Sequence, residues 1–269
     1  MNDRVRELLE EKLSNVPDKP AVALSGGVDS TSCLFALQEL GKSPQAYTFH
    51  VDGHESTDLR VARRICEQFD VPFTPVELPT DLTTIKQDTY AIIKGLGLTS
   101  KTNVECIWPR WYLLQAVEES TLVTGDCADA HFANSKKGAM HYKDSVERMN
   151  QYRDEHFSNP NYAQLRTIRK LGTQYGVNEV VAPYRDKEFQ DLFYDTSWEE
   201  VNNPRMKEPI RQAYPKRFGA VSIHSANLQT SDSKIQDQFE KLVDSLWNID
   251  DWKTPVGIYN AIERGKVPP

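Results

Sequence analysis

The stretch ALSGGVDSTSCLFAL (residues 23–37) sets two glycines and an aspartate between an apolar run and a helical pattern. The residues just before it, KPAVAL (19–24), have the composition of a buried strand. Beyond Asp29, four apolar residues recur on one helical face: Cys33, Leu34, Leu37 and Leu40. Gly41 is a typical residue for the end of such a helix. The stretch therefore predicts a strand, a glycine turn and a helix in direct succession.

The same alternation continues along the first half of the chain. Further strands are expected at AYTFHV (46–51), FTPVEL (73–78) and STLVTGD (120–126), although Pro75 weakens the second of them. Helical patterns lie between these runs. The alternation predicts the α/β class, with a doubly wound parallel sheet whose ligands bind at the carboxyl ends of the strands.

From about residue 141 the pattern changes to helices only. We therefore expect two parts that form one compact unit. Residues 1–140 would be the α/β core, and residues 141–269 would be a helical part that completes the substrate site.

Composition restricts the function classes for this chain of 269 residues. Apolar runs fall far short of the roughly 20 residues that span a bilayer, and MNDRVRELLEEKLSNV (1–16) lacks the apolar core of a secretory signal. A cytoplasmic protein without membrane contact is expected. A net charge of −7 disfavours nucleic acid as a partner. The four cysteines form no C-x-x-C pair, so neither a disulfide framework nor a zinc site is indicated.

The glycine turn has the composition of a phosphate site. Gly26 and Gly27 allow positive φ and close approach of a ligand, and the amides that follow form an anion nest at the start of a helix. Ser25 and Ser30 add hydroxyl donors. The turn matches neither a Walker loop nor a dinucleotide fingerprint. Asp29 would repel phosphate unless a cation lies between them, which indicates Mg²⁺. The alternative is a turn that only connects strand to helix.

The S-G-G-x-D-S pattern resembles the pyrophosphate loop of the ATP pyrophosphatase (PP-loop) superfamily, whose members adenylate a substrate and release pyrophosphate. The resemblance implies an adenine-nucleotide alpha-hydrolase-like fold, with ATP and Mg²⁺ as cofactors. Leu24, His50, Val51 and Gly125 are assigned to nucleotide binding together with the turn.

TGDCADAHF (124–132) resembles the segment S-G-E-G-A-D-E-L-F of asparagine synthetases and also follows a predicted strand. The resemblance assigns Asp129 to the metal, which it would share with Asp29. It sets Asp126 in the place of an acid near the reacting centre. The alternative is a polar loop without function.

The likeness continues in order from about residue 20 to 240. GVNEVVAPYRDKEFQDLF (176–193) and KEPIRQAYP (207–215) resemble two further segments of the synthetase domain. We expect Glu179 and Asp126 to orient or deprotonate the amine. The chain departs from the family at Val181, where arginine is usual.

The family's catalytic lysine has no counterpart in SIHSANLQTSDSKI (222–235). Three interpretations stay open. His224 or Lys234 substitutes for it, Lys207 reaches the site, or the chemistry has changed. The chain reaches its glycine turn by residue 25, so no glutaminase domain precedes it in this sequence.

These features predict an ATP-dependent amidoligase. It would adenylate a small carboxylate and pass ammonia, or an amine, to it. A separate protein could supply the ammonia or carry the substrate. One alternative is a nucleotide-modifying, tRNA-modifying or sulfur-transferring ATP pyrophosphatase, and another is a non-catalytic nucleotide-binding regulator. The aromatic and basic cluster from Trp108 to Tyr112 would either stack on a substrate or serve helix packing.

Overall fold

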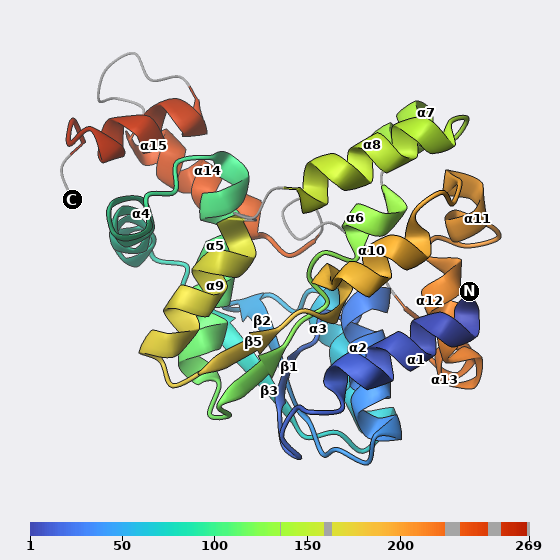
Figure 1. The fold of residues 1–269 in the computed structure, drawn as a ribbon. Coiled ribbons are helices and arrows are strands. Elements are labelled where there is room, and N and C mark those ends of the chain that lie inside the picture. The colour runs from blue at the N-terminus through green and yellow to red at the C-terminus, as the bar shows by residue number, and fades with distance from the viewer. Residues whose placement is uncertain (135, 159–162, 224–231, 247–253, 268–269) are drawn as a thin grey trace.

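The computed structural model describes the chain except for residues 135, 159–162, 224–231, 247–253 and 268–269. Its centre is a parallel sheet of five strands in the order β3, β2, β1, β4, β5 (Figure 1). The strands are β1 (Ala21–Ala23), β2 (Gln45–Val51), β3 (Phe73–Leu78), β4 (Thr121–Val123) and β5 (Glu179–Val181). The predicted α/β class with a doubly wound parallel sheet is confirmed.

Helices flank this sheet. In the first part of the chain they are α1 (Asn2–Leu13), α2 (Val28–Glu39), α3 (Thr57–Gln68), α4 (Leu82–Leu96), α5 (Lys101–Ala116) and α6 (Asp129–Phe132). The next are α7 (Lys136–Tyr142), α8 (Val146–Phe157), α9 (Ala163–Gln174), the 3₁₀ turn η1 (Pro183–Arg185), α10 (Lys187–Phe193) and α11 (Trp198–Asn202). The last are α12 (Glu208–Ala213), α13 (Pro215–Ala220), α14 (Ile235–Leu246) and α15 (Pro255–Glu263). In the described part of the chain, no helix has both the length and the apolar character to cross a membrane.

The fifth strand corrects one prediction. The segment after residue 141 is not helical throughout, because β5 pairs with β4 and extends the sheet. Its apolar run is three residues long, too short for a periodic signal. The division of the chain near residue 140 stays a prediction.

The order of the strands creates a crevice between β1 and β4. The chain moves outward from β1 to β3, then returns to the other side of β1 for β4 and β5. The carboxyl ends of β1 and β4 therefore lie at the switch point, where ligands bind in such sheets. Pro75 is tolerated because β3 is an edge strand.

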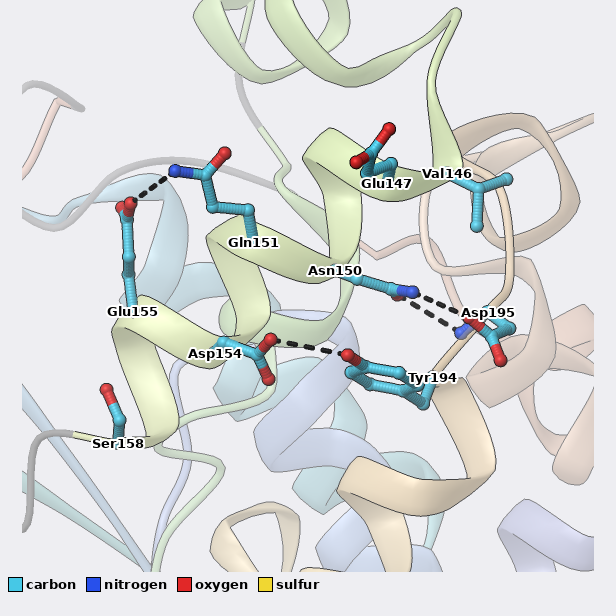
Figure 2. Close-up of a pocket in the computed structure, with 9 residues that line it drawn as sticks. All are labelled: Val146, Glu147, Asn150, Gln151, Asp154, Glu155, Ser158, Tyr194 and Asp195. Carbon is cyan, nitrogen blue, oxygen red and sulfur yellow. Dashed lines mark hydrogen bonds between the residues drawn. The ribbon is translucent and has the colours of Figure 1, made fainter.

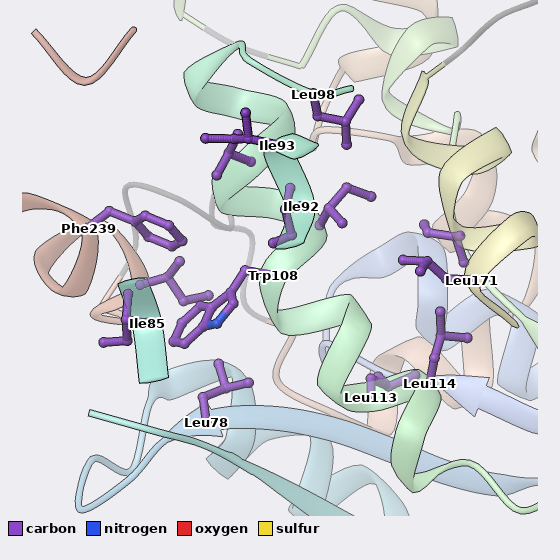
Figure 3. Packing of buried hydrophobic residues seen from close by; sticks show 14 of the residues in the cluster. Leu78, Ile85, Ile92, Ile93, Leu98, Trp108, Leu113, Leu114, Leu171 and Phe239 are labelled. Carbon is purple, nitrogen blue, oxygen red and sulfur yellow. The ribbon is translucent and has the colours of Figure 1, made fainter. Parts of the chain in front are cut away.

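A hydrophobic core lies on each face of the sheet. On one face, α5 packs with α4, α9 and α14, and Trp108 is fully buried among them (Figure 3). Its indole donates to Asp88 Oδ2 at 2.9 Å and meets the ring of Phe239 edge-on. On the other face, α2 packs with α1 and α12. Trp108 therefore serves helix packing.

Candidate active site

The glycine loop (residues 25–30) joins β1 to α2 as predicted. Gly26 has φ of +72°, and a Cβ atom there would lie 2.6 Å from Val61 Cγ1, so only glycine fits. The hydroxyls of Ser25 and Ser30 are 3.1 Å apart. Gly27 caps α2 without a side-chain hydrogen bond, which leaves the first amides of the helix for a ligand.

A cavity of about 620 Å³ opens over this loop. Nine of the predicted site residues line it: Leu24, Ser25, Gly27, Asp29, Ser30, Gly125, Asp126, Asp129 and Lys207. Gly26 is not among the lining residues and instead shapes the turn beneath them.

The loop after β4, residues 124–129, packs directly on the glycine loop. A Cβ atom at Gly125 would lie 2.7 Å from Ser30 N and 2.8 Å from the carbonyl carbon of Asp29. Both neighbours are backbone atoms, which cannot rotate away. Glycine at position 125 is therefore what allows the two loops to touch.

Lys207 bridges the two loops. Its Nζ lies 2.5 Å from Asp29 Oδ2 and 2.5 Å from Asp129 Oδ1, and the residue is 5% exposed. We call these three residues the lysine cluster. Burial raises the pKa of Asp29 to about 6, and Lys207 opposes that shift. Burial lowers the pKa of Lys207, but the two carboxylates more than offset this and raise it to about 12.

The lysine cluster fits a divalent cation in its donor types. Asp29 Oδ1 is buried and has no hydrogen-bond partner among the described residues. The described residues contain no group of three or more His, Cys, Asp or Glu side chains arranged for a metal. A cation held by two carboxylates needs other oxygen ligands, and Mg²⁺ commonly takes them from phosphates and water. Asp29 and Asp129 are thus suitable ligands for Mg²⁺ that arrives with a polyphosphate.

A second charge group, the arginine pair, lies in the same cavity. Arg110 donates from both η nitrogens to the carboxylate of Asp126, at 2.7 and 3.2 Å. Arg110 comes from α5, and Asp126 follows Gly125 in the loop after β4. Sequence reasoning assigned Arg110 no separate role. The available signal was that Arg110 lies within a mostly apolar run, IWPRWYLL (107–114).

The structure does not bring Glu179 to Asp126. Glu179 is the first residue of β5, exposed, and pairs in register with Thr121 at the start of β4. It therefore lies at the amino edge of the sheet, opposite the edge that carries Asp126. The motif likeness indicated the order of Asp126 and Glu179 in the chain. It did not indicate that Glu179 begins β5, at the opposite edge of the sheet from Asp126.

The structure separates the candidate residues for the family's catalytic lysine. Lys207 lines the cavity. Lys234 is exposed, pairs with Asp237 at 3.0 Å and does not line the cavity. His224 lies outside the described residues. Of the lysines that sequence reasoning considered, Lys207 is the one that reaches the site.

The residues of β2 that line the cavity lie earlier in the strand than the two residues predicted to bind the nucleotide. Tyr47, Thr48 and Phe49 line the cavity, whereas His50 and Val51 do not. The reason is the register: β1 ends opposite Tyr47, and the last residues of β2 extend beyond it and pair with β3 alone. Val51 is buried in the core instead.

Two cysteines, Cys106 and Cys127, also line the cavity. Burial raises the pKa of Cys106 to about 11 and that of Cys127 to about 12. Both thiols therefore stay protonated at neutral pH, which disfavours a nucleophilic role. Cys127 has φ of +73°, at the position where the family has glycine.

Another cavity, of about 850 Å³, runs along α8 (Figure 2). None of the residues that line it also lines the cavity over the glycine loop. Asn150 bonds Asp195, and Tyr194 donates to Asp154 at 3.3 Å, so part of its polar wall is paired internally. Sequence reasoning pointed to none of its residues.

Curated relatives match short parts of the chain. A 7-cyano-7-deazaguanine synthase of Leptospira interrogans is 31% identical over 85 residues, which are 30% of this chain and 35% of that protein. A tRNA(Ile)-lysidine synthase of Porphyromonas gingivalis is 39% identical over 85 residues, 30% of this chain and 19% of that protein. The chain thus aligns with about a third or less of the length of these relatives.

Solved structures are more distant. A U34-tRNA thiolase from Methanococcus maripaludis covers 97% of this chain and 76% of its own, with 15% identity and a TM-score of 0.40. A predicted subunit of tRNA methyltransferase from Methanocaldococcus jannaschii covers 61% of this chain and 66% of its own, with 14% identity and a TM-score of 0.32.

The family comparison covers far more of the chain than these partial matches. The model of the family named asparagine synthase matches residues 4–239, which include the glycine loop, the loop after β4 and Lys207. The chain therefore belongs to the asparagine synthase family of PP-loop ATP pyrophosphatases.

Proposed function

We propose that this protein transfers AMP from ATP to an oxygen of an acceptor molecule and then joins a nitrogen nucleophile to it. In the first step, the acceptor oxygen attacks the α-phosphorus, the bond to the bridging oxygen of the β-phosphate breaks, and pyrophosphate leaves. In the second step, nitrogen attacks the activated carbon, the carbon–oxygen bond breaks, AMP leaves and nitrogen loses a proton.

One observation carries this proposal. A single cavity contains both the phosphate-binding turn and, one residue beyond Gly125, the arginine pair. The turn suits the triphosphate because it offers amides and hydroxyls at a helix start. The pair suits an acceptor because a guanidinium has five donors and can hold a second planar group while it holds Asp126.

The residues of the lysine cluster would act on the phosphates. Mg²⁺ held by Asp29 and Asp129 would neutralise charge on the departing pyrophosphate. Lys207, with its ammonium already at this position, would bind a phosphate oxygen and stabilise the charge that develops there. This assigns Lys207 the role for which the sequence left three candidates.

The acceptor we favour is a small heterocyclic base or nucleotide. His156 and Phe157 are half-buried and line the cavity, and the guanidinium of Arg185 lies 5.4 Å from the centroid of the Phe157 ring. Because His131 stacks on the Phe157 ring at 4.6 Å and Arg185 lies over it, the guanidinium of Arg185 and the imidazole of His156 are the flat groups that would meet the face of a base. A net charge of −7 disfavours a polynucleotide as the physiological acceptor. The partial likeness to a 7-cyano-7-deazaguanine synthase supports the same class.

A second candidate is an amidoligase for a small carboxylic acid such as an amino acid. The match to the asparagine synthase family over residues 4–239 favours it, and Arg110 would bind a carboxylate equally well. In either case the nitrogen would come from free ammonia, from a partner protein or from an amine. We propose the cytoplasm as the compartment, since ATP is available there.

Product release distinguishes these candidates. The protein is incubated with ATP, Mg²⁺ and ammonium chloride, together with 7-deazaguanine-7-carboxylate, L-aspartate or bulk tRNA in separate reactions. We expect equal amounts of AMP and pyrophosphate with the heterocyclic acid, and a product with one added nitrogen by mass spectrometry. Release only with aspartate would favour the amidoligase, and release only with tRNA a macromolecular acceptor.

Asp29→Asn is the negative control, since full turnover in that variant would contradict the metal assignment. ATP binding without turnover on any acceptor would support the non-catalytic regulator instead.

A further inference from the structure

We propose that Lys207 acts as an internal cation that keeps free divalent metal out of the site until ATP arrives. It rests on the proposed function, because it assumes that Asp29 and Asp129 bind a metal with the nucleotide. In the structure, the ammonium of Lys207 lies between these two carboxylates, 2.5 Å from an oxygen of each. The metal and the ammonium therefore compete for one position.

Burial makes this competition effective. The side chain of Lys207 is 6% exposed and that of Asp29 is 19% exposed, so bulk water screens the attraction of this pair poorly. The side chain of Asp129 is 71% exposed, so its attraction to Lys207 is screened more strongly. A metal ion that entered without nucleotide would meet a buried ammonium beside the same carboxylates. Repulsion between the two cations opposes that entry.

ATP removes the conflict because it brings both a new partner and new ligands. Its phosphates offer oxygens to the ammonium of Lys207 and to the metal at the same time. Once Lys207 bonds a phosphate, Asp29 and Asp129 are released to the metal. Asp29 Oδ1, which is buried without a hydrogen-bond partner among the described residues, is a ready additional ligand atom.

The backbone of Lys207 is fixed, so only its side chain needs to move. Lys207 has φ of 59° and ψ of 38°, a left-handed conformation at the start of α12. Its amide donates to Asn202 Oδ1 at 3.1 Å, and Asn202 in turn donates to the carbonyl of Phe132 at the end of α6. This chain of hydrogen bonds ties Lys207 to the segment that carries Asp129.

Lys12 provides a matched control on the surface of the same molecule. Its Nζ lies among three carboxylates, at 2.7 Å from Glu188, 3.1 Å from Glu11 and 3.4 Å from Asp186. Each of these acids is at least 37% exposed, so the group has no buried carboxylate like Asp29, water can screen it and no metal site should form when Lys12 is removed.

The test is a titration of nucleotide-free protein with Mn²⁺ at pH 8, followed by the electron paramagnetic resonance signal of free Mn²⁺. We expect wild type and K12M to bind Mn²⁺ weakly. K207M should bind one Mn²⁺ at least ten-fold more tightly, and K207M/D129N should lose that gain. Adding the non-hydrolysable analogue AMPCPP should tighten Mn²⁺ binding to wild type far more than to K207M.

Equal Mn²⁺ affinity of wild type and K207M without nucleotide would overturn the proposal. If K207M does not fold, K207Q keeps a hydrogen-bonding side chain without the charge and should show the same gain. A K207Q variant that folds and shows no gain also overturns it. The titration needs no turnover, so AMPCPP binding with normal metal exchange but no AMP release would remove the proposed function and leave this inference standing.

Discussion

The lysine cluster and the arginine pair lie in one cavity but differ in how they are held. The side chain of Lys207 is 6% exposed, and it bridges Asp29 in the glycine loop and Asp129 after β4, which are far apart in the sequence. Arg110 is 23% exposed at its side chain and holds Asp126 through two hydrogen bonds. Lys207 is thus the more enclosed of the two cations, whereas the half-buried guanidinium of Arg110 is planar and has five donors to share among partners.

The loop after β4 supplies one acid to each group. Asp126 is the acid of the arginine pair, and Asp129, three residues later, is an acid of the lysine cluster. Because Gly125 has no side chain, the start of this loop can pack directly against the backbone of the glycine loop. We infer that the loop divides the cavity into a nucleotide end and an acceptor end, and substitutions should affect one end without the other.

Gly125→Ala should have the largest effect, because it separates the two loops. The added Cβ would lie 2.7 Å from Ser30 N, and the backbone must shift to admit it. We expect ATP affinity to fall by more than about 100-fold, or about 3 kcal/mol, measured by isothermal titration calorimetry. Gly95→Ala on α4 is the control, since a Cβ there meets nothing within 4 Å. Normal ATP binding by the Gly125 variant would contradict the division of the cavity.

Arg110→Gln should affect only the acceptor end. Loss of charge-assisted hydrogen bonds costs about 1.5–3 kcal/mol, so we expect KM for the acceptor to rise by about 10- to 100-fold. The dissociation constant of ATP should stay within about two-fold of the wild-type value, because Arg110 would contact the acceptor and not the nucleotide. Arg110→Lys keeps the charge without the planar fork and should recover part of the loss. A joint loss of ATP and acceptor binding would show that the two ends are not separable.

The contrast also explains what the sequence could predict. The glycine loop and the loop after β4 were found because their requirements are local, as the φ of +72° at Gly26 illustrates. The contact between Lys207 and Asp29 spans 178 positions, and sequence reasoning could only name Lys207 as one of three candidates. Its position depends on how α12 packs against α2, which no local pattern encodes.

Glu179, His50 and Val51 were misplaced for the same physical reason. Glu179 was assigned to the site because its motif follows the others in order, but β5 sets it at the amino edge of the sheet. Val51 was assigned to the nucleotide from its place at the end of β2, but the short β1 moves the cavity back to Tyr47 and Phe49. Strand register is a tertiary property, so neither error was visible in the sequence.

A third prediction concerns His131, a buried histidine close in sequence to both Asp126 and Asp129. His131, two residues after Asp129, is fully buried and donates from Nε2 to the carbonyl of Tyr184 at 2.8 Å. Burial lowers its pKa to about 3. The unfolded chain binds a proton at His131 below its ordinary pKa of about 6.5 and the folded chain does not, so stability falls as pH falls from that value.

We expect wild type to lose about 2 kcal/mol more than His131→Gln between pH 6.5 and pH 5. The measurement is the free energy of unfolding in urea at each pH. The substitution lowers stability at every pH, so the difference in slope is the result that counts. Parallel curves for the two proteins would mean that His131 binds a proton as readily in the folded chain as in the unfolded chain, so that its pKa is not lowered.

Cys127→Gly should have the smallest effect and tests whether sulfur takes part in the chemistry. Cys127 has φ of +73°, which costs a non-glycine residue about 1–2 kcal/mol. Glycine removes that strain but loses the packing of the thiol and gains freedom in the unfolded chain. These terms oppose one another, so we expect the free energy of unfolding to change by less than about 1 kcal/mol and AMP release to continue.

Cys106→Ala is the companion variant, because Cys106 lines the same cavity from α5. Buried, protonated thiols at both positions predict that each variant keeps turnover within about ten-fold of wild type. A loss of more than about 100-fold in either variant, with ATP affinity unchanged, would assign the thiol to the reaction. The acceptor end would then perform sulfur chemistry, and the role of the arginine pair would change from binding the acceptor to tuning that thiol.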